Sequence, residues 1–240
     1  MWAREGWHLI EEGRWLAFSG LPSVDYNLAC CYGSEANGAE CAKLLEQTLD
    51  DVRTAAVPCV VSVAGVALGS VQVLVDAGWV CVAQQPFMRL PALDAPVSRR
   101  DSVVRCLGTG DAYEVLAVVA DAFGVQTPME ALPVPGDGKP TGTLRWWGVD
   151  IAGELLSVAA SSVAGPSAVL WWVATRRSQW RQGHARRLLT SVHSQLVAEG
   201  IDEFLLCSSM VGMPLYYELG YRVLEYFQQW SRPRWALGRG

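Results

Sequence analysis

The 240-residue sequence lacks the features that would place it in several specialised classes of protein. No uninterrupted apolar run reaches 18 residues, which argues against a membrane-spanning helix and a membrane partner. The first 15 residues have neither a basic segment nor an apolar segment, so we expect no signal peptide and a cytoplasmic protein. Charged residues make up only 18% of the chain against 51% hydrophobic residues, which argues against disorder and allows a sizeable core.

Metal-binding and disulfide patterns are also missing. The seven cysteines are odd in number, form no C-x-x-C pair and lie mostly in apolar segments, and the chain has only three histidines. We therefore interpret the cysteines as buried free thiols and expect neither a metal site nor a cysteine nucleophile. The net charge of −5, with positive charge concentrated in one loop, does not suggest a nucleic-acid partner.

That loop, residues 176–187, carries the clearest functional signal. It follows a strand-like apolar run at residues 168–175 and leads into a predicted amphipathic helix that ends before Gly200. The apolar positions of this helix are Ala185, Leu188, Leu189, Val192 and Leu196. The loop holds five arginines, and no acidic residue occurs between positions 171 and 198. A glycine at a helix start lets a phosphate approach unpaired backbone amides, so the pattern predicts an anion site.

Residues 180–185, WRQGHA, resemble the pyrophosphate loop of the GCN5-related N-acetyltransferases, whose signature is Gln/Arg-x-x-Gly-x-Gly/Ala. The glycine and the final small residue match, whereas Trp180 stands at the first position. The resemblance implies that backbone amides of this loop, with charge from a neighbouring arginine, bind the pyrophosphate of coenzyme A. The implied cofactor-binding residues of the loop are Arg181, Gln182, Gly183, His184, Ala185 and Arg186.

A second motif lies where this family requires it. Residues 215–221, LYYELGY, resemble the family's Leu/Phe-Tyr-x-x-x-Gly-Phe/Tyr. The resemblance implies that Tyr216 is the general acid that protonates the departing CoA thiolate. Ser209 stands at the position of a cofactor-contacting asparagine. Tyr216 and Tyr217 are expected to point to different faces, so that only one is catalytic and the other is a packed aromatic.

The predicted element order over residues 101–231 is β α α β β β α β α β, which is that of a whole acetyltransferase of this family. The elements include a helix at 111–123, a short helix at 127–132 and a loop at 133–140. The implied fold is α/β, with a mixed, mostly antiparallel sheet flanked by helices. In this family the fourth strand splays from the fifth, which implies that Val173, Ala174 and Thr175 hold the pantetheine arm and the thioester.

An internal repeat relates the two ends of the chain. Residues 74–85 and 216–227 share the pattern of helix end, glycine, aromatic and strand at an offset of 142 residues. The corresponding first loop, near residues 32–40, carries Glu35 and Glu40 and no arginine, so it would repel a pyrophosphate. We therefore predict a truncated, degenerate acetyltransferase-like domain at 1–98 and a complete acyl-CoA-binding catalytic domain at 99–240.

These observations favour an enzyme that transfers an acetyl or other short acyl group directly from acyl-CoA to a primary amine of a small molecule. The alternatives are a non-catalytic acyl-CoA-binding module and a related enzyme that performs O- or S-acyl transfer or decarboxylation. The general base is left open between water and the carboxylates of Asp121, Glu130 and Glu154. Trp146 or Trp147 is a candidate wall of the acceptor pocket, although core packing is the commoner role of such residues.

Overall fold

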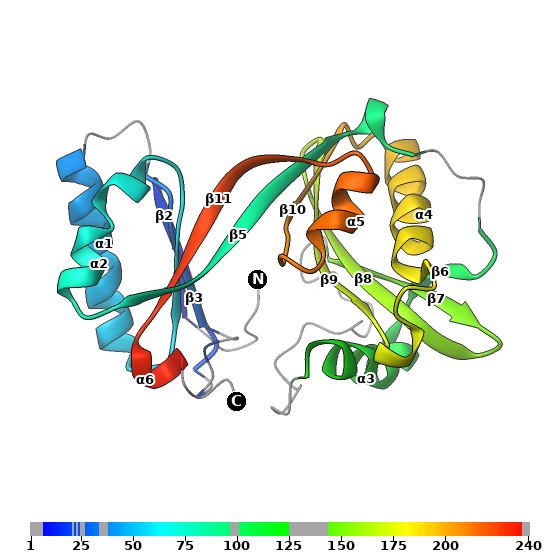
Figure 1. The fold of residues 1–240 in the computed structure, drawn as a ribbon, viewed down its shortest axis with the longest axis horizontal. Coiled ribbons are helices and arrows are strands. Elements are labelled where there is room, and N and C mark those ends of the chain that lie inside the picture. The colour runs from blue at the N-terminus through cyan, green and yellow to red at the C-terminus, as the bar shows by residue number, and fades with distance from the viewer. Residues whose placement is uncertain are drawn as a thin grey trace. The chain divides into compact units, whose positions relative to one another are not determined.

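The computed structural model describes residues 7–20, 22, 24, 27–33, 38–96, 101–124 and 144–236. The chain divides into two compact units (Figure 1). Unit 1 comprises Met1–Pro86 and Glu225–Gly240, and unit 2 comprises Phe87–Leu224. Strands β5 (Val80–Pro91) and β11 (Arg222–Ser231) each have residues in both units.

In unit 1, a sheet with the order β1-β2-β3-β4-β11 is packed by two helices. Its elements are β1 (Trp7–Glu11), β2 (Arg14–Phe18), β3 (Asn27–Cys31), α1 (Gly38–Ala55), β4 (Val60–Val63) and α2 (Gln72–Asp76), with α6 (Pro233–Ala236) following β11. Strand β1 was not predicted from the sequence, whereas the predicted strands and helix of this region are found within a few residues of their expected bounds.

In unit 2, the sheet order is β5-β10-β9-β8-β7-β6. Its elements are β6 (Val104–Leu107), α3 (Ala112–Phe123), β7 (Arg145–Ile151), β8 (Glu154–Ala164), β9 (Ser167–Thr175), α4 (His184–Ala198), β10 (Glu203–Cys207) and α5 (Met213–Glu218). All the described neighbours in this sheet pair antiparallel except β9 and β10. Figure 1 shows α4 and α5 on one side of the sheet and α3 on the other.

Helices α3 and α4 of unit 2 begin and end within a residue or two of the positions that the sequence predicts. The apolar positions of α4, including Leu188, Leu189 and Val192, are fully buried, because the period of 3.6 residues sets them on one face. Gly200 follows α4 with φ +94°, the left-handed conformation expected where a helix ends. The predicted helix at 127–132, the loop at 133–140 and Glu130 lie outside the described residues.

The last strand of each half of the chain pairs with a strand from the other half. Strand β5, from the first half of the chain, pairs antiparallel with β10 through residues 87–91. Strand β11, from the second half, pairs antiparallel with β4 through residues 228–230. The element order β-β-β-α-β-α-β occurs twice, from β1 to β5 and from β7 to β11. The predicted domain boundary between residues 98 and 99 separates the two copies of this repeat and stays a prediction. The two compact units are divided differently, because β5 and β11 each pair with strands of the other half of the chain.

The core of unit 2 lies between its sheet and helices α4 and α5, and it contains aromatic side chains from distant segments. His193 is fully buried and its Nε2 atom lies 2.9 Å from the hydroxyl of Tyr221. Trp146 and Trp147 are both 2% exposed, and the indole N–H of Trp147 donates to the hydroxyl of Ser161. Both tryptophans are core residues, so the structure does not favour either as a wall of an acceptor pocket.

Candidate functional site

The sheet of unit 2 opens between β9 and β10. The two strands pair in parallel only where Ser167–Val169 face residues 203–205. From residue 170 to Thr175, β9 has no ladder partner on the β10 side, while it continues to pair with β8. We call this opened edge the seam. It agrees with the splayed fourth and fifth strands that the sequence resemblance implied.

The backbone groups of β9 that face the seam follow from the pairing with β8. The amide of Arg176 donates to the carbonyl of Leu156 at 2.9 Å, so Arg176 and, by alternation, Ala174 face β8. The carbonyl of Ala174 also accepts a hydrogen bond from the hydroxyl of Ser157 at 2.8 Å. Val173 and Thr175 therefore present their backbone groups to the seam. Of the three predicted residues of this strand, the geometry suits these two better than Ala174.

A β-bulge interrupts β9 inside the seam. Val158 pairs with Ala174 and Ala160 with Trp171, so one residue of β8 opposes two residues of β9. Trp172 is one of the two and has φ +51°, a conformation that L-residues with large side chains rarely adopt. The sequence contains no signal for this bulge.

The loop before α4 presents unpaired backbone donors. Gly183 is the residue before the helix, with φ +83°, and a Cβ built on it would meet no atom within 4 Å. Among the described residues, no hydrogen-bond acceptor is found for the backbone N–H groups of residues 181–186. The first turn of α4 has no acidic residue. These open donors, at the positive end of a helix of 15 residues, fit a phosphate group.

The arginines of this loop are less available than the sequence suggests, because carboxylates reach them from other elements. Three arginines form ion pairs, namely Arg176 with Glu114, Arg186 with Glu218 and Arg187 with Asp101. Arg186, predicted to bind the cofactor, is thus shared with a carboxylate of α5. Arg181 is exposed, and no described carboxylate pairs with it. Of the five arginines, Arg177 and Arg181 are in none of these ion pairs, and the Arg177 guanidinium lies beside Gly124 at the end of α3. The positive charge available to an anion at this loop is therefore centred on Arg181 and the start of α4.

Two further residues of the loop have defined structural positions. The indole N–H of Trp180, which replaces the family's first arginine or glutamine, donates to the carbonyl of Thr175 at 2.7 Å. It ties the loop to the end of β9. The Nε2 atom of His184 is buried and has no hydrogen-bond partner among the described residues. The backbone amide of His184, rather than this ring nitrogen, is therefore the group available to a phosphate.

Tyr216 lies in the core of unit 2, near the seam, and its ring stands edge-on to Tyr221 with centroids 5.6 Å apart. Burial raises its pKa well above the usual range, so the hydroxyl keeps its proton at neutral pH. Val173 packs against the same core. Tyr217 is 41% exposed, which agrees with the expectation that the two tyrosines point to different faces.

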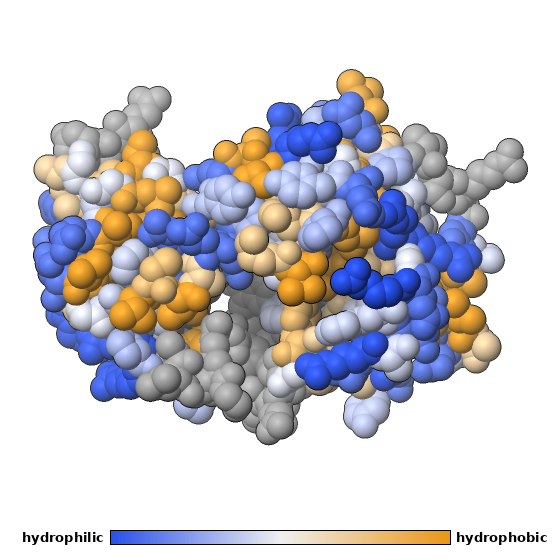
Figure 2. All heavy atoms as spheres, viewed as in Figure 1, coloured by the Kyte–Doolittle hydropathy of each residue, from blue (hydrophilic) through white to orange (hydrophobic). Residues whose placement is uncertain are grey.

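Ser209 lies close to Tyr216, in the turn between β10 and α5. A Cβ built on Gly212 would lie 3.1 Å from the Tyr216 ring and 3.3 Å from the Ser209 hydroxyl. This hydroxyl oxygen accepts a hydrogen bond from the amide of Gly212 at 3.1 Å, so its O–H and one lone pair remain for a ligand. Figure 2 shows apolar side chains at the surface around this turn, where Met210 and Val211 are exposed.

The described candidates for a general base lie next to the residues that follow the C-terminal end of β9. A carboxylate oxygen of Asp121 accepts a hydrogen bond from the amide of Arg177 at 2.6 Å. Glu154 is 63% exposed and lies 3.9 Å from Arg176. Burial raises the pKa of Cys31 to about 11 and that of Cys59 further, so these two thiols keep their protons at neutral pH. Cys81, Cys106 and Cys207 are exposed rather than buried, which corrects the prediction for these three.

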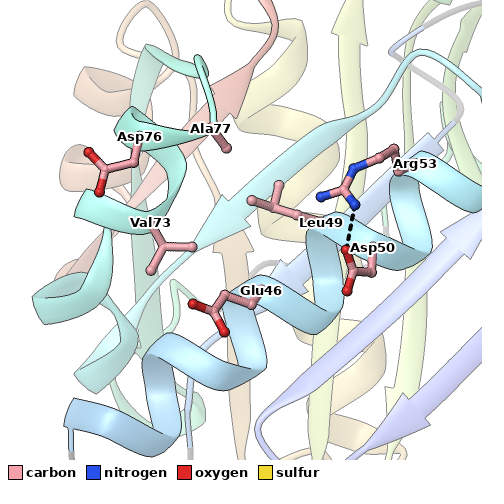
Figure 3. A pocket seen from close by; sticks show the side chains of 7 residues that line it. All are labelled: Glu46, Leu49, Asp50, Arg53, Val73, Asp76 and Ala77. Carbon is pink, nitrogen blue, oxygen red and sulfur yellow. Dashed lines mark hydrogen bonds and ion pairs between the residues drawn. The ribbon is translucent and has the colours of Figure 1, made fainter.

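Unit 1 has a hollow of about 460 Å³ on its surface (Figure 3). Helix α1 supplies four of its lining residues, and α2 with the residue that follows supplies three. They are Glu46, Leu49, Asp50, Arg53, Val73, Asp76 and Ala77. Arg53 is paired with Asp50 at 2.7 Å, so the lining keeps a net negative charge that disfavours phosphates.

The described residues contain no helix long and apolar enough to span a membrane, and no group of three or more His, Cys, Asp or Glu side chains that would hold a metal ion. No family model and no curated protein matches the sequence.

Solved structures match over nearly the whole chain. The GCN5-related N-acetyltransferase from Kribbella flavida is 18% identical and gives a TM-score of 0.70, over 96% of this chain and 90% of the other. A putative GNAT-family acetyltransferase from Novosphingobium aromaticivorans is 18% identical, with a TM-score of 0.57 over 94% and 91% of the two chains. A GCN5-related N-acetyltransferase from Sphaerobacter thermophilus is 16% identical, with a TM-score of 0.62 over 91% and 76%. The predicted α/β fold, with its mostly antiparallel sheet, is confirmed as that of these proteins.

Proposed function

We propose that the chain is a GCN5-related N-acetyltransferase that moves an acetyl or other short acyl group from acyl-CoA to a primary amine of a small molecule. The observation that carries this proposal is the combination, in one unit, of a seam with free backbone groups and a helix start with free amides. Both features would bind acyl-CoA through backbone groups, so this binding does not depend on the side chains at 180 and 209, where Trp180 and Ser209 differ from the family's motifs.

In this proposal each part of acyl-CoA meets a different part of unit 2. The pyrophosphate binds the amides of residues 181–186, with the guanidinium of Arg181 beside them. The pantetheine arm extends along the seam as an added strand and pairs with the backbone of Val173 and with the amide of Thr175, whose carbonyl already accepts a hydrogen bond from Trp180. An amide at the seam donates a hydrogen bond to the thioester carbonyl oxygen as negative charge develops on it.

The transfer needs no covalent enzyme intermediate. The nitrogen of the neutral amine attacks the thioester carbon, the C–S bond breaks, and the sulfur leaves as a thiolate. Tyr216 gives its proton to this thiolate, since burial keeps the phenol protonated until the sulfur accepts it. The amine loses its extra proton to water or to a carboxylate near the end of β9, such as Asp121. Tyr216 then regains a proton from solvent.

We further propose that residues 1–98 are a degenerate copy of the same domain that binds no acyl-CoA. The repeated element order supports a common origin of the halves. Among the described residues of the first half, no elements correspond to β6 and α3, and its loop carries glutamates where the second half carries arginines. The match to the Kribbella flavida protein covers 96% of this chain, so it includes residues of both units of this chain.

The proposal is tested by the release of free thiol from acetyl-CoA in the presence of a panel of primary amines, with the wild type and Tyr216→Phe. We expect turnover with at least one amine and a loss of about 100-fold in kcat for Tyr216→Phe, with an unchanged dissociation constant for acetyl-CoA. The conservative Tyr217→Phe variant serves as the matched control and should keep wild-type rates. Tight binding of acetyl-CoA without turnover on any amine would favour the non-catalytic binding module.

A further inference from the structure

The bulge in β9 changes which face of the sheet Trp172 occupies. Leu170 packs in the core on the α4 side of unit 2. Regular alternation would place residue 172 on that same side and residue 173 on the other. Instead, Val173 packs against the α4-side core, whereas the ring of Trp172 meets Phe123 of α3 edge-on with centroids 6.1 Å apart. The extra residue has shifted the alternation by one position.

Two consecutive tryptophans therefore share the α3 side of the sheet. The indole N–H of Trp171 donates to the hydroxyl of Ser162 at 2.8 Å. The neighbouring Ser161 bonds the core residue Trp147, so Ser162 faces the opposite side, where α3 packs. Trp171 and Trp172 are both partly exposed. An exposed aromatic surface thus lies on the α3 side, beside the seam.

The backbone conformation of Trp172 costs free energy, which suggests a functional role for this residue. A positive φ at a tryptophan is strained, and such strain concentrates at binding and catalytic sites. Phe123, at the end of α3, is 50% exposed although it contacts the strained residue. Neither ring is buried enough for core packing alone to explain the strain.

The position of these rings relates them to the reaction. Trp172 immediately precedes Val173, whose backbone faces the seam and holds the thioester in the proposed function. Phe123 follows two residues after Asp121, whose carboxylate lies against the amide of Arg177. The Arg177 guanidinium also lies at this end of α3, beside Gly124, whereas the Arg176–Glu114 pair lies at the start of the helix. A protonated amine approaching the thioester from the α3 side therefore meets a carboxylate and two aromatic rings.

We propose that Trp172 and Phe123, which we call the aromatic wall, determine acceptor specificity, and that the acceptor is a primary amine carried on an aromatic or similarly bulky apolar group. The edge of one ring and the faces of both offer apolar contact, and their quadrupoles favour a nearby ammonium group. This inference rests on the proposed function for the role of the seam. It adds the chemical class of the acceptor.

The test uses the full chain and two amines of different character, phenethylamine and ethanolamine. Their binding is followed by NMR titration with and without saturating CoA, in the wild type, Phe123→Ala and Trp172→Gly. Glycine at 172 adopts the positive φ without strain, so that variant should keep the fold. Tyr113→Ala, on α3 and 80% exposed, is the matched control because it removes an aromatic ring away from the wall.

We expect the wild type to bind phenethylamine about tenfold or more tightly than ethanolamine, and both wall variants to reduce this ratio toward unity. Tyr113→Ala should leave the ratio unchanged. A wild type without preference for phenethylamine, or a preference that survives in both wall variants, would overturn the proposal. Failure of the proposed function is visible separately, as the absence of acetyl-CoA binding in a calorimetric titration of the same samples.

Discussion

Replacing Gly183 by aspartate or by asparagine separates the charge at the start of α4 from its backbone geometry. Both side chains tolerate the left-handed conformation that Gly183 adopts at φ +83°, and both enter open space, since no atom lies within 4 Å of the Cβ position. The two variants have nearly the same shape and differ by one negative charge. A difference between them in CoA affinity therefore reports the electrostatics of the loop.

The size of this difference follows from Coulomb's law. For two phosphate charges at about 6 Å and an effective dielectric constant of about 40 to 80, the repulsion sums to roughly 1.4–2.8 kcal/mol. This corresponds to an affinity loss of about ten- to a hundredfold for Gly183→Asp, whereas Gly183→Asn should stay within about threefold of the wild type. The loss should shrink in 1 M salt, where the screening length falls to about 3 Å.

The assay is calorimetric titration with CoA at low and at high salt, after circular dichroism has shown that both variants are folded. Equal affinities for the aspartate and asparagine variants would refute the placement of the pyrophosphate at this loop. A loss in Gly183→Asp that does not respond to salt would refute the electrostatic explanation.

Three further predictions concern the fold that supports the site. Burial lowers the pKa of His193 from 6.5 to about 3, so the unfolded chain takes up a proton on this histidine at a higher pH than the folded chain does. The free energy of unfolding should therefore fall by about 1.4 kcal/mol per pH unit as the pH drops from about 6.5 toward 3. In denaturant titrations at several pH values, His193→Gln should show a smaller dependence of this free energy on pH. Gly148→Ala should destabilise by about 1–3 kcal/mol, because the new methyl group clashes with Leu155, whereas Gly108→Ala enters open space and should change the melting temperature little. A fragment of residues 99–240 lacks β5, which pairs with the edge of β10, so it should aggregate or unfold at a lower temperature than the full chain. Equal melting temperatures would contradict the pairing of β5 with β10.

Local patterns account for what the sequence predicted correctly. The period of apolar residues placed α3 and α4 within a residue or two of their bounds, because burial of one helix face dominates local structure. The glycines at 183 and 200 marked the start and end of α4, since each adopts a positive φ that other residues avoid. The tyrosine motif predicted that Tyr216 and Tyr217 point to different faces, and the burial of Tyr216 with the exposure of Tyr217 agrees with this, although the exposed Tyr217 is not the packed aromatic that was expected.

What the sequence did not predict depends on partners far apart in the chain. Glu114, Glu218 and Asp101 neutralise arginines that look unpaired in the sequence, because tertiary structure brings carboxylates to the loop. The pairing of β5 with β10 and of β11 with β4 was not predicted, because the apolar pattern of a strand does not determine which strand lies beside it. The bulge at Trp172 was missed since it depends on the register between β8 and β9.

The central claim is that this chain binds acyl-CoA in unit 2 and does not bind it in unit 1. Calorimetric titration of the wild-type chain with acetyl-CoA tests it most directly. We predict saturable binding with a stoichiometry of one acetyl-CoA per chain. A stoichiometry of two would contradict the non-binding role of residues 1–98, and the absence of binding would contradict the assignment of the chain as an acyl-CoA-dependent enzyme.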